Sequence, residues 1–193
     1  MKNKKTFFII ALVFVLLIGG ATVLYRQLGK NIAAEQLATQ STNQSDESAA
    51  GETEQKIKAP DFTVYDADGN EVHLADYIGK PIVLNFWASW CGPCQSEMPD
   101  FNEKYLELGD DVHFLMINMT DGARETVESA SAFIAKNEYA FPVFYDTKSD
   151  AASIYGAYSL PTTFFIDADG YAIAQATGAI DAETLQRGLD MIK

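Results

Sequence analysis

Residues 82–94 are IVLNFWASWCGPC, and this stretch decides the fold. The apolar run at 82–88 is typical of a buried strand, and residues 95–99 have the character of a helix start. The two cysteines, Cys91 and Cys94, therefore lie on a strand-to-helix turn. This predicts that Cys91 is close to the N-terminus of the helix.

The cysteine pair is better suited to redox chemistry than to holding the fold together. Cys91 and Cys94 are the only cysteines in the chain. A disulfide between them would stabilise the fold little, because the entropy of loop closure grows with loop length. Free N–H groups and the helix dipole favour a thiolate at a helix N-terminus. We therefore predict that Cys91 attacks a substrate disulfide and that Cys94 resolves the mixed disulfide. Trp90 would shield Cys91 and offer an apolar contact to partner proteins.

Two other interpretations of the pair stay open, half of a zinc site and a purely structural disulfide. Zinc needs about four ligands. The remaining candidate ligands are His73 and His113, which have no metal-ligand spacing to each other or to the cysteines. We therefore favour thiol chemistry and expect neither a metal nor a cofactor.

The N-terminus has the composition of a membrane anchor. Residues 1–6 carry three lysines, and residues 7–25 contain no charged side chain. As a helix, the uncharged segment would span ~28 Å, close to the ~30 Å of a hydrocarbon core. We predict a cytoplasmic tail at 1–6 and a transmembrane signal-anchor at 7–25, because the lysine-rich side stays in the cytoplasm. A signal peptide cleaved near residues 19–21 is the alternative.

Two further regions follow the predicted anchor. Residues 26–58 are rich in Gln, Ser, Thr, Ala and Glu and contain few large apolar residues, which predicts a flexible linker. Its reach would be ~30 Å. Residues 59–193 have the size of one domain. This organisation predicts a single-pass membrane protein whose C-terminal domain is extracytoplasmic.

The domain at 59–193 is strongly acidic. It carries seven Lys and Arg residues and 22 Asp and Glu residues. Such a surface disfavours nucleic acid and anionic lipid as partners. Solubility is the simplest reason for this charge, and a specific basic partner is the alternative. We expect a monomer.

Strands and helices alternate along the domain. A hairpin is predicted at 62–65 and 71–74, strands at 82–87, 112–118 and 143–145, helices at 95–108 (interrupted or kinked at Pro99), 124–136 and 151–155, a second hairpin at 162–167 and 171–176, and a final helix from Asp181. This order predicts an α/β sandwich around a mixed sheet.

The domain resembles the thioredoxin superfamily in its membrane-anchored TlpA/ResA-type branch. The matching motifs are APDF at 59–62, LNFWASWCGPC at 84–94, EMP at 97–99 and LPTTFFID at 160–167. They follow the family's order across the whole domain. The resemblance implies a thioredoxin-like fold, a mixed central sheet flanked by helices, with an added N-terminal β-hairpin and a helical insertion at 124–137.

The resemblance also implies roles for single residues. Pro161 matches the family's cis-proline, which faces the redox pair, and Leu160 and Thr162 would flank the substrate; an ordinary turn proline is the alternative. Asn85 stands where thioredoxin has a buried aspartate, and it cannot exchange a proton. Glu97 matches a glutamate that this branch places near the pair. We predict that Glu97 accepts the proton of the resolving cysteine; a solvated glutamate on the helix face is the alternative.

These features together predict a membrane-tethered, extracytoplasmic thiol-disulfide oxidoreductase that reduces exported proteins. Thioredoxin, with a potential near ~−270 mV, also has Gly-Pro between its cysteines. The resemblance implies a membrane thiol carrier of the CcdA/DsbD kind as electron donor. It implies apocytochrome c, methionine sulfoxide reductase or wrongly oxidised surface proteins as substrates, and hence a part in cytochrome c maturation.

Three other functions are considered. A disulfide-forming oxidase would use the same cysteine pair in the opposite direction. A peroxidase is suggested by APDF at 59–62, which also opens peroxiredoxin domains. That family needs Pro and Thr shortly before its cysteine, whereas residues 87–90 are WASW. A non-enzymatic adhesion or scaffold module would not need Cys91 at all.

Overall fold

The computed structural model describes residues 37–39 and 56–193. The predicted tail and anchor, at 1–6 and 7–25, lie outside these residues. Within the described part of the chain, no helix has both the length and the apolar character needed to cross a membrane.

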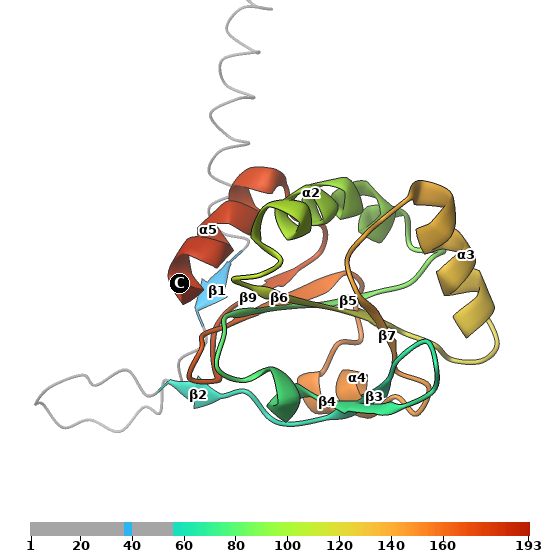
Figure 1. The fold of residues 1–193 in the computed structure, drawn as a ribbon, viewed down its shortest axis with the longest axis horizontal. Helices are drawn as coiled ribbons and strands as arrows, with labels where there is room; N and C mark the ends of the chain where they lie inside the picture. The colour runs from blue at the N-terminus through green and yellow to red at the C-terminus, as the bar shows by residue number, and fades with distance from the viewer. Residues whose placement is uncertain (1–36, 40–55) are drawn as a thin grey trace, which may run out of the picture. The chain divides into compact units, whose positions relative to one another are not determined.

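A mixed sheet forms the centre of the described domain (Figure 1), with the strand order β1-β9-β8-β5-β6-β7-β3-β4 and with β2 also paired to β9. Strand β5 (Ile82–Trp87) lies in the middle, parallel to β6 (His113–Asn118) and antiparallel to β8 (Thr162–Ile166). Strand β7 (Val143–Tyr145) is parallel to β6, and β9 (Tyr171–Thr177) is antiparallel to β8. The predicted mixed sheet is therefore confirmed.

Short strands extend both edges of the sheet. The predicted N-terminal hairpin is present as β3 (Thr63–Tyr65) and β4 (Glu71–His73), and β3 pairs with β7. At the other edge, β1 (Ala38–Thr39) and β2 (Ile57–Lys58) pair with β9. Both of these strands come from the predicted linker at 26–58, so two pieces of that segment lie against the sheet.

Helices cover both faces of the sheet, as Figure 1 shows. One face carries α2 (Gly92–Leu108), α3 (Val127–Asn137) and α5 (Ala182–Ile192). The other carries α4 (Asp150–Tyr155) and a short 3-10 helix, η1 (Leu74–Tyr77). This arrangement is the predicted α/β sandwich.

Strand β5 contributes to both halves of the hydrophobic core. Ile82, Leu84 and Phe86 belong to the cluster that includes buried residues of α4. Val83 and Trp87 belong to the cluster that includes buried residues of α2 and α5. A strand buried on both faces has an almost continuous apolar sequence for this reason. Both cysteines also belong to the second cluster, so the redox pair lies at the margin of the core.

Helix α5 packs so closely on β8 that only glycine fits at position 188. A Cβ atom there would collide with the ring of Phe165, which is fully buried. Leu185 and Leu189 on either side of Gly188 are also fully buried. This close packing fixes α5, and with it the loop that precedes α5.

The helix that follows the cysteine turn begins earlier than predicted. The sequence predicts residues 95–108, whereas α2 begins at Gly92 with Cys91 as its N-cap. The Cys91 side chain accepts a hydrogen bond from the Cys94 backbone, and Pro93 suits the first turn because its missing N–H has no partner there anyway. Helix α2 also continues through Pro99 without interruption.

The predicted helix at 124–136 begins later than expected. The structure places Arg124 and Glu125 in a loop, and α3 starts at Val127 after the N-cap Thr126. The cause is Asp121, whose Oδ1 accepts the backbone N–H groups of both Arg124 and Glu125. A side chain that binds nearby backbone in this way competes with the helix.

Candidate active site

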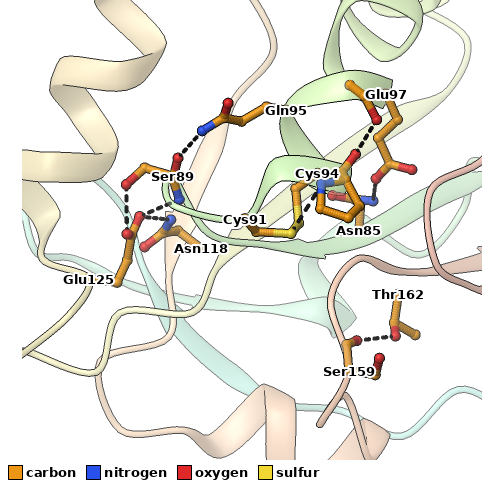
Figure 2. Close-up of a disulfide and its surroundings, with 12 residues drawn as sticks. Asn85, Ser89, Cys91, Cys94, Gln95, Glu97, Asn118, Glu125, Ser159 and Thr162 are labelled. Atoms are coloured by element: carbon orange, nitrogen blue, oxygen red, sulfur yellow. Dashed lines mark hydrogen bonds between the residues drawn. A yellow bond between two sulfur atoms is a disulfide. The ribbon is translucent and has the colours of Figure 1, made fainter.

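The two cysteines form a disulfide at the start of α2 (Figure 2). Their Cα atoms are 5.3 Å apart. Cys91 keeps 5% of its surface exposed, whereas Cys94 has none. An incoming sulfur can therefore reach Cys91, while Cys94 is shielded by the protein.

The helix N-terminus is arranged to stabilise a Cys91 thiolate. The backbone N–H of Cys94 donates to Cys91 Sγ at 3.2 Å. A donor aimed at the sulfur favours its charged form once the disulfide opens, and the helix dipole acts in the same direction. The predicted position of Cys91 at the helix N-terminus is confirmed by its place as N-cap.

A cavity of about 550 Å³ opens beside Cys91. Three parts of the chain, distant in sequence, form its walls. They are the cysteine turn with Trp90 and Pro93, the loop before α3 with Arg124, and the segment before β8 with Tyr158 and Leu160. Trp90 and Tyr158 are 42% and 85% exposed, so this wall presents aromatic surface to a partner.

The peptide bond between Leu160 and Pro161 is cis, as the resemblance predicts. Pro161 is buried, and its carbonyl accepts the N–H of Gly178 at 2.8 Å. Thr162 is buried too, and its hydroxyl donates to the Ser159 carbonyl at 2.6 Å. The predicted substrate contacts in this segment are Leu160, Pro161 and Thr162. Of these three residues, Leu160 alone lines the cavity.

Glu97 is almost completely buried, with 2% of its surface exposed. The alternative of a solvated helix-face glutamate is therefore wrong. Asn85 Nδ2 donates to Glu97 Oε1 at 2.9 Å, and the Ile180 N–H donates to Oε2 at 3.0 Å. Burial raises the pKa of Glu97 to about 7, and these two hydrogen bonds oppose the rise.

The surroundings of Glu97 connect it to the cysteine pair. Glu97 lies three residues after Cys94 on α2, and side chains at this spacing share one face of a helix. Asn85, beneath it on β5, also donates to Thr163 Oγ1 at 3.0 Å. Among the described residues, Asn85 Oδ1 has no hydrogen-bond partner. The site therefore contains a carboxyl group that changes charge near neutral pH, on the same helix face as a buried sulfur.

A second buried carboxylate, Glu125, was not predicted from the sequence. Glu125 has no exposed surface, and it is hydrogen-bonded to Ser89, two residues before Cys91, and to Asn118 at the end of β6. The available signal was indirect. Polar residues at the carboxyl ends of neighbouring parallel strands are brought to one edge of the sheet, where α/β proteins place their sites.

The two histidines lie away from the cysteine turn, in the predicted strands. His73 is in β4 and His113 is in β6. In residues 37–39 and 56–193, no group of three or more His, Cys, Asp or Glu side chains could hold a metal ion.

Known proteins are similar to this chain in sequence and in fold. The model of the AhpC/TSA family matches residues 56–174. The thiol-disulfide oxidoreductase ResA of Bacillus thuringiensis subsp. konkukian is 38% identical over 138 residues, which cover 70% of this chain and 76% of the relative. A DsbF homologue from Corynebacterium diphtheriae has a similar crystal structure, with a TM-score of 0.63 and 29% identity, covering 78% of this chain and 96% of that one. The exposed lipoprotein thioredoxin Etrx1 of Streptococcus pneumoniae is also similar, with a TM-score of 0.59 and 32% identity over 68% of this chain and 98% of that one.

Glu97 should make the stability of the protein depend on pH. Its folded pKa of about 7 lies above the ordinary value of 4.5, so between these values the folded protein holds a proton that the unfolded chain has lost. The stability that this bound proton gives the folded protein is therefore fully present below pH 4.5 and is lost as the pH rises through 7. From about pH 5.5 to about pH 8, the free energy of unfolding should fall by about 2 kcal/mol more in the wild type than in Glu97→Gln.

Urea unfolding of the disulfide form at a series of pH values measures this difference. Glu103→Gln is the matched control, because Glu103 is exposed on the same helix. Parallel pH profiles for the wild type and Glu97→Gln would contradict the assignment.

Proposed function

We propose that this chain, which belongs to the AhpC/TSA family and is a thiol-disulfide oxidoreductase of the ResA type, is a reductase tethered to the outer face of the bacterial cell membrane. The observation that carries the exchange chemistry of this proposal is the pairing of an accessible Cys91 with a shielded Cys94 and the buried carboxyl group of Glu97. Cys91 fits the first step of disulfide reduction, and Cys94 and Glu97 together fit the second.

The first step belongs to Cys91. Its thiolate attacks one sulfur of the substrate disulfide, the substrate S–S bond breaks, and the second substrate sulfur leaves as a thiolate. The product is a mixed disulfide between Cys91 and the substrate. Accessibility and the N–H of Cys94 support this assignment, because the attacking sulfur must be both reachable and ionised.

The second step belongs to Cys94 and Glu97. Cys94 loses its proton to Glu97 and attacks Cys91 Sγ. The bond between Cys91 and the substrate breaks, so the substrate leaves with both sulfurs reduced and the protein retains a disulfide. Two electrons have then passed from the protein to the substrate. A carboxyl group with a pKa of about 7 suits this transfer, because a base is most effective when its pKa lies near the working pH.

Location and direction rest on the sequence. The lysines before the uncharged segment at 7–25 favour a domain outside the cytoplasm. The relative Etrx1 is described as an exposed lipoprotein, which agrees with that location. The Gly92-Pro93 dipeptide favours the reducing direction.

A reductase outside the cytoplasm must be reduced again after each cycle. We propose a membrane thiol carrier of the CcdA/DsbD kind as its electron donor. The proposed substrates are disulfides of exported proteins, such as apocytochrome c or methionine sulfoxide reductase. The same two steps in reverse would form disulfides, so an oxidase is the competing function.

Replacing Glu97 by Gln should slow the second step selectively. The Gln side chain cannot take up the proton of Cys94, so at pH 7 the release of substrate from the mixed disulfide should slow by about a hundredfold. In the wild type this rate should rise with pH through a transition near 7. In Glu97→Gln the rise should move toward the ordinary thiol pKa of about 8.5.

Rapid-mixing experiments that follow formation and decay of the mixed disulfide separate the two steps. Glu103→Gln should behave like the wild type. An unchanged pH profile for substrate release in Glu97→Gln would remove Glu97 from the mechanism.

Replacing Cys94 by Ala should trap substrates in cells. Without the resolving sulfur the mixed disulfide persists, so exported proteins should be recovered bound to Cys91 of the full chain and released by a reducing agent. The double variant Cys91→Ala/Cys94→Ala is the control for non-specific capture. Recovery of the same proteins with the double variant, or of none with Cys94→Ala, would refute the proposed function.

A further inference from the structure

We propose that Glu125 is a positioning residue for thiol-disulfide exchange. It joins the turn before Cys91 to the loop that carries Arg124, and so fixes the cavity wall that a protein substrate contacts. The proposal rests on exchange at Cys91 alone, and not on the location or the direction of the reaction.

Glu125 is held by three hydrogen bonds to its carboxylate, as Figure 2 shows. Its Oε1 accepts the Ser89 backbone N–H at 2.9 Å and Asn118 Nδ2 at 2.7 Å. Its Oε2 accepts the Ser89 hydroxyl at 2.7 Å. A fully buried carboxylate with this many donors is strongly held in place, because leaving any one donor unpaired in the interior is costly.

The partners of Glu125 belong to the framework of the sheet. Asn118 ends β6, and Ser89 follows β5, which is parallel to β6. The other end of the Asn118 amide is held as well, because Thr120 Oγ1 donates to Asn118 Oδ1 at 2.7 Å. Glu125 is therefore tied to the ends of two central strands.

The loop around Glu125 is closed by its own hydrogen bonds. Asp121 Oδ1 accepts the N–H groups of Ala123, Arg124 and Glu125 at 2.8, 2.8 and 2.9 Å. The Gly122 N–H donates to the Glu125 carbonyl at 2.9 Å. A loop built in this way moves as a unit, so the anchor at Glu125 also sets the position of Arg124.

Arg124 forms the cavity wall together with Trp90. Its guanidinium carbon lies 3.5 Å from the centre of the Trp90 ring, and both residues line the cavity beside Cys91. Both side chains are exposed, and cation–π contacts at exposed sites are weak. The stacked pair therefore depends on the buried Glu125 anchor, which holds the backbone on both of its sides.

This arrangement predicts a selective effect on large substrates. The N–H that faces Cys91 Sγ comes from α2, not from Glu125. A small disulfide can approach Cys91 without lying along the wall. A protein disulfide brings a chain segment with it, and that segment must pack against Trp90 and Arg124.

The test compares two substrates: insulin, with dithiothreitol as the reductant, and dithiobis(nitrobenzoate), mixed in a single turnover with protein that has been reduced beforehand and freed of dithiothreitol. For Glu125→Ala, KM for insulin should rise about tenfold or more, because a displaced contact surface disturbs the alignment of the reacting sulfurs. The rate with the small disulfide should change less than about twofold. Glu128→Ala is the matched control, since Glu128 is exposed in the adjoining helix.

The conservative variant Glu125→Gln, unlike Glu125→Ala, should have the KM of the wild type for insulin. Its amide oxygen can accept both N–H groups, and its amide nitrogen can donate to the Ser89 hydroxyl, which rotates to accept. Arg124→Ala should raise KM for insulin in the same way, and combining it with Glu125→Ala should add little, because both changes remove the same wall.

Equal losses with both substrates, an unchanged KM for insulin, or fully additive effects of the two alanine variants would each overturn the proposal. If Glu125→Ala does not fold, Ser89→Ala decides in its place, because it removes only the hydroxyl bond; it must raise KM for insulin while sparing the small disulfide. Failure of trapping in cells would leave this comparison intact, since the comparison needs only exchange with purified protein.

Discussion

The packing of the structure keeps the carboxyl group of Glu97 out of water, on the face of α2 that also carries Cys94. Glu97 comes from α2, its donor Asn85 from β5, and its donor Ile180 from the loop before α5. These elements can surround Glu97 only if α2 and α5 pack side by side on the central strands, and the glycine at 188 allows that packing. Burial then raises the pKa of Glu97 to about 7, which is the property that the proposed proton transfer uses. The fold and this proposed step thus depend on the same set of contacts.

The cysteine turn lies between two buried carboxylates with different tasks (Figure 2). Glu97, on the side of Cys94, has one amide and one backbone donor and is placed to take up a proton. Glu125, on the side of Ser89, has three donors and joins two segments of backbone. In the proposed mechanism the first acts on the reacting sulfurs, and the second acts on the surface that a substrate meets.

The central strands, both hairpins and the cysteine turn were predictable because their signals are local. Residues 82–94 combine an apolar run with Gly-Pro at a helix start, and the family resemblance of the motif at 160–167 predicted the cis-proline.

The start of α2 was placed too late, because cysteine is not among the residues that usually mark an N-cap. Arg124 and Glu125 were included in a helix because they directly precede apolar residues with helical spacing. The Asp121 side chain binds their backbone N–H groups instead, and the spacing of apolar residues does not reveal that competition. The proposed role of Glu125 depends on its hydrogen bond with Ser89, which lies 36 residues away in the sequence. No local sequence pattern predicts such a long-range hydrogen bond. Strands β1 and β2, of two residues each, are too short to show a period.

Transfer of electrons from the Cys91–Cys94 pair to its partners is the property that defines the proposed reductase. Its most direct test is the reduction potential of the full chain, measured by equilibration with glutathione buffers of known composition. Thioredoxin lies near about −270 mV and the strong oxidant DsbA near about −120 mV, so a reductase and an oxidase should lie toward opposite ends of that range. We expect a value below about −220 mV, on the thioredoxin side. A value above about −200 mV would contradict the reductase function and would make the protein an oxidant.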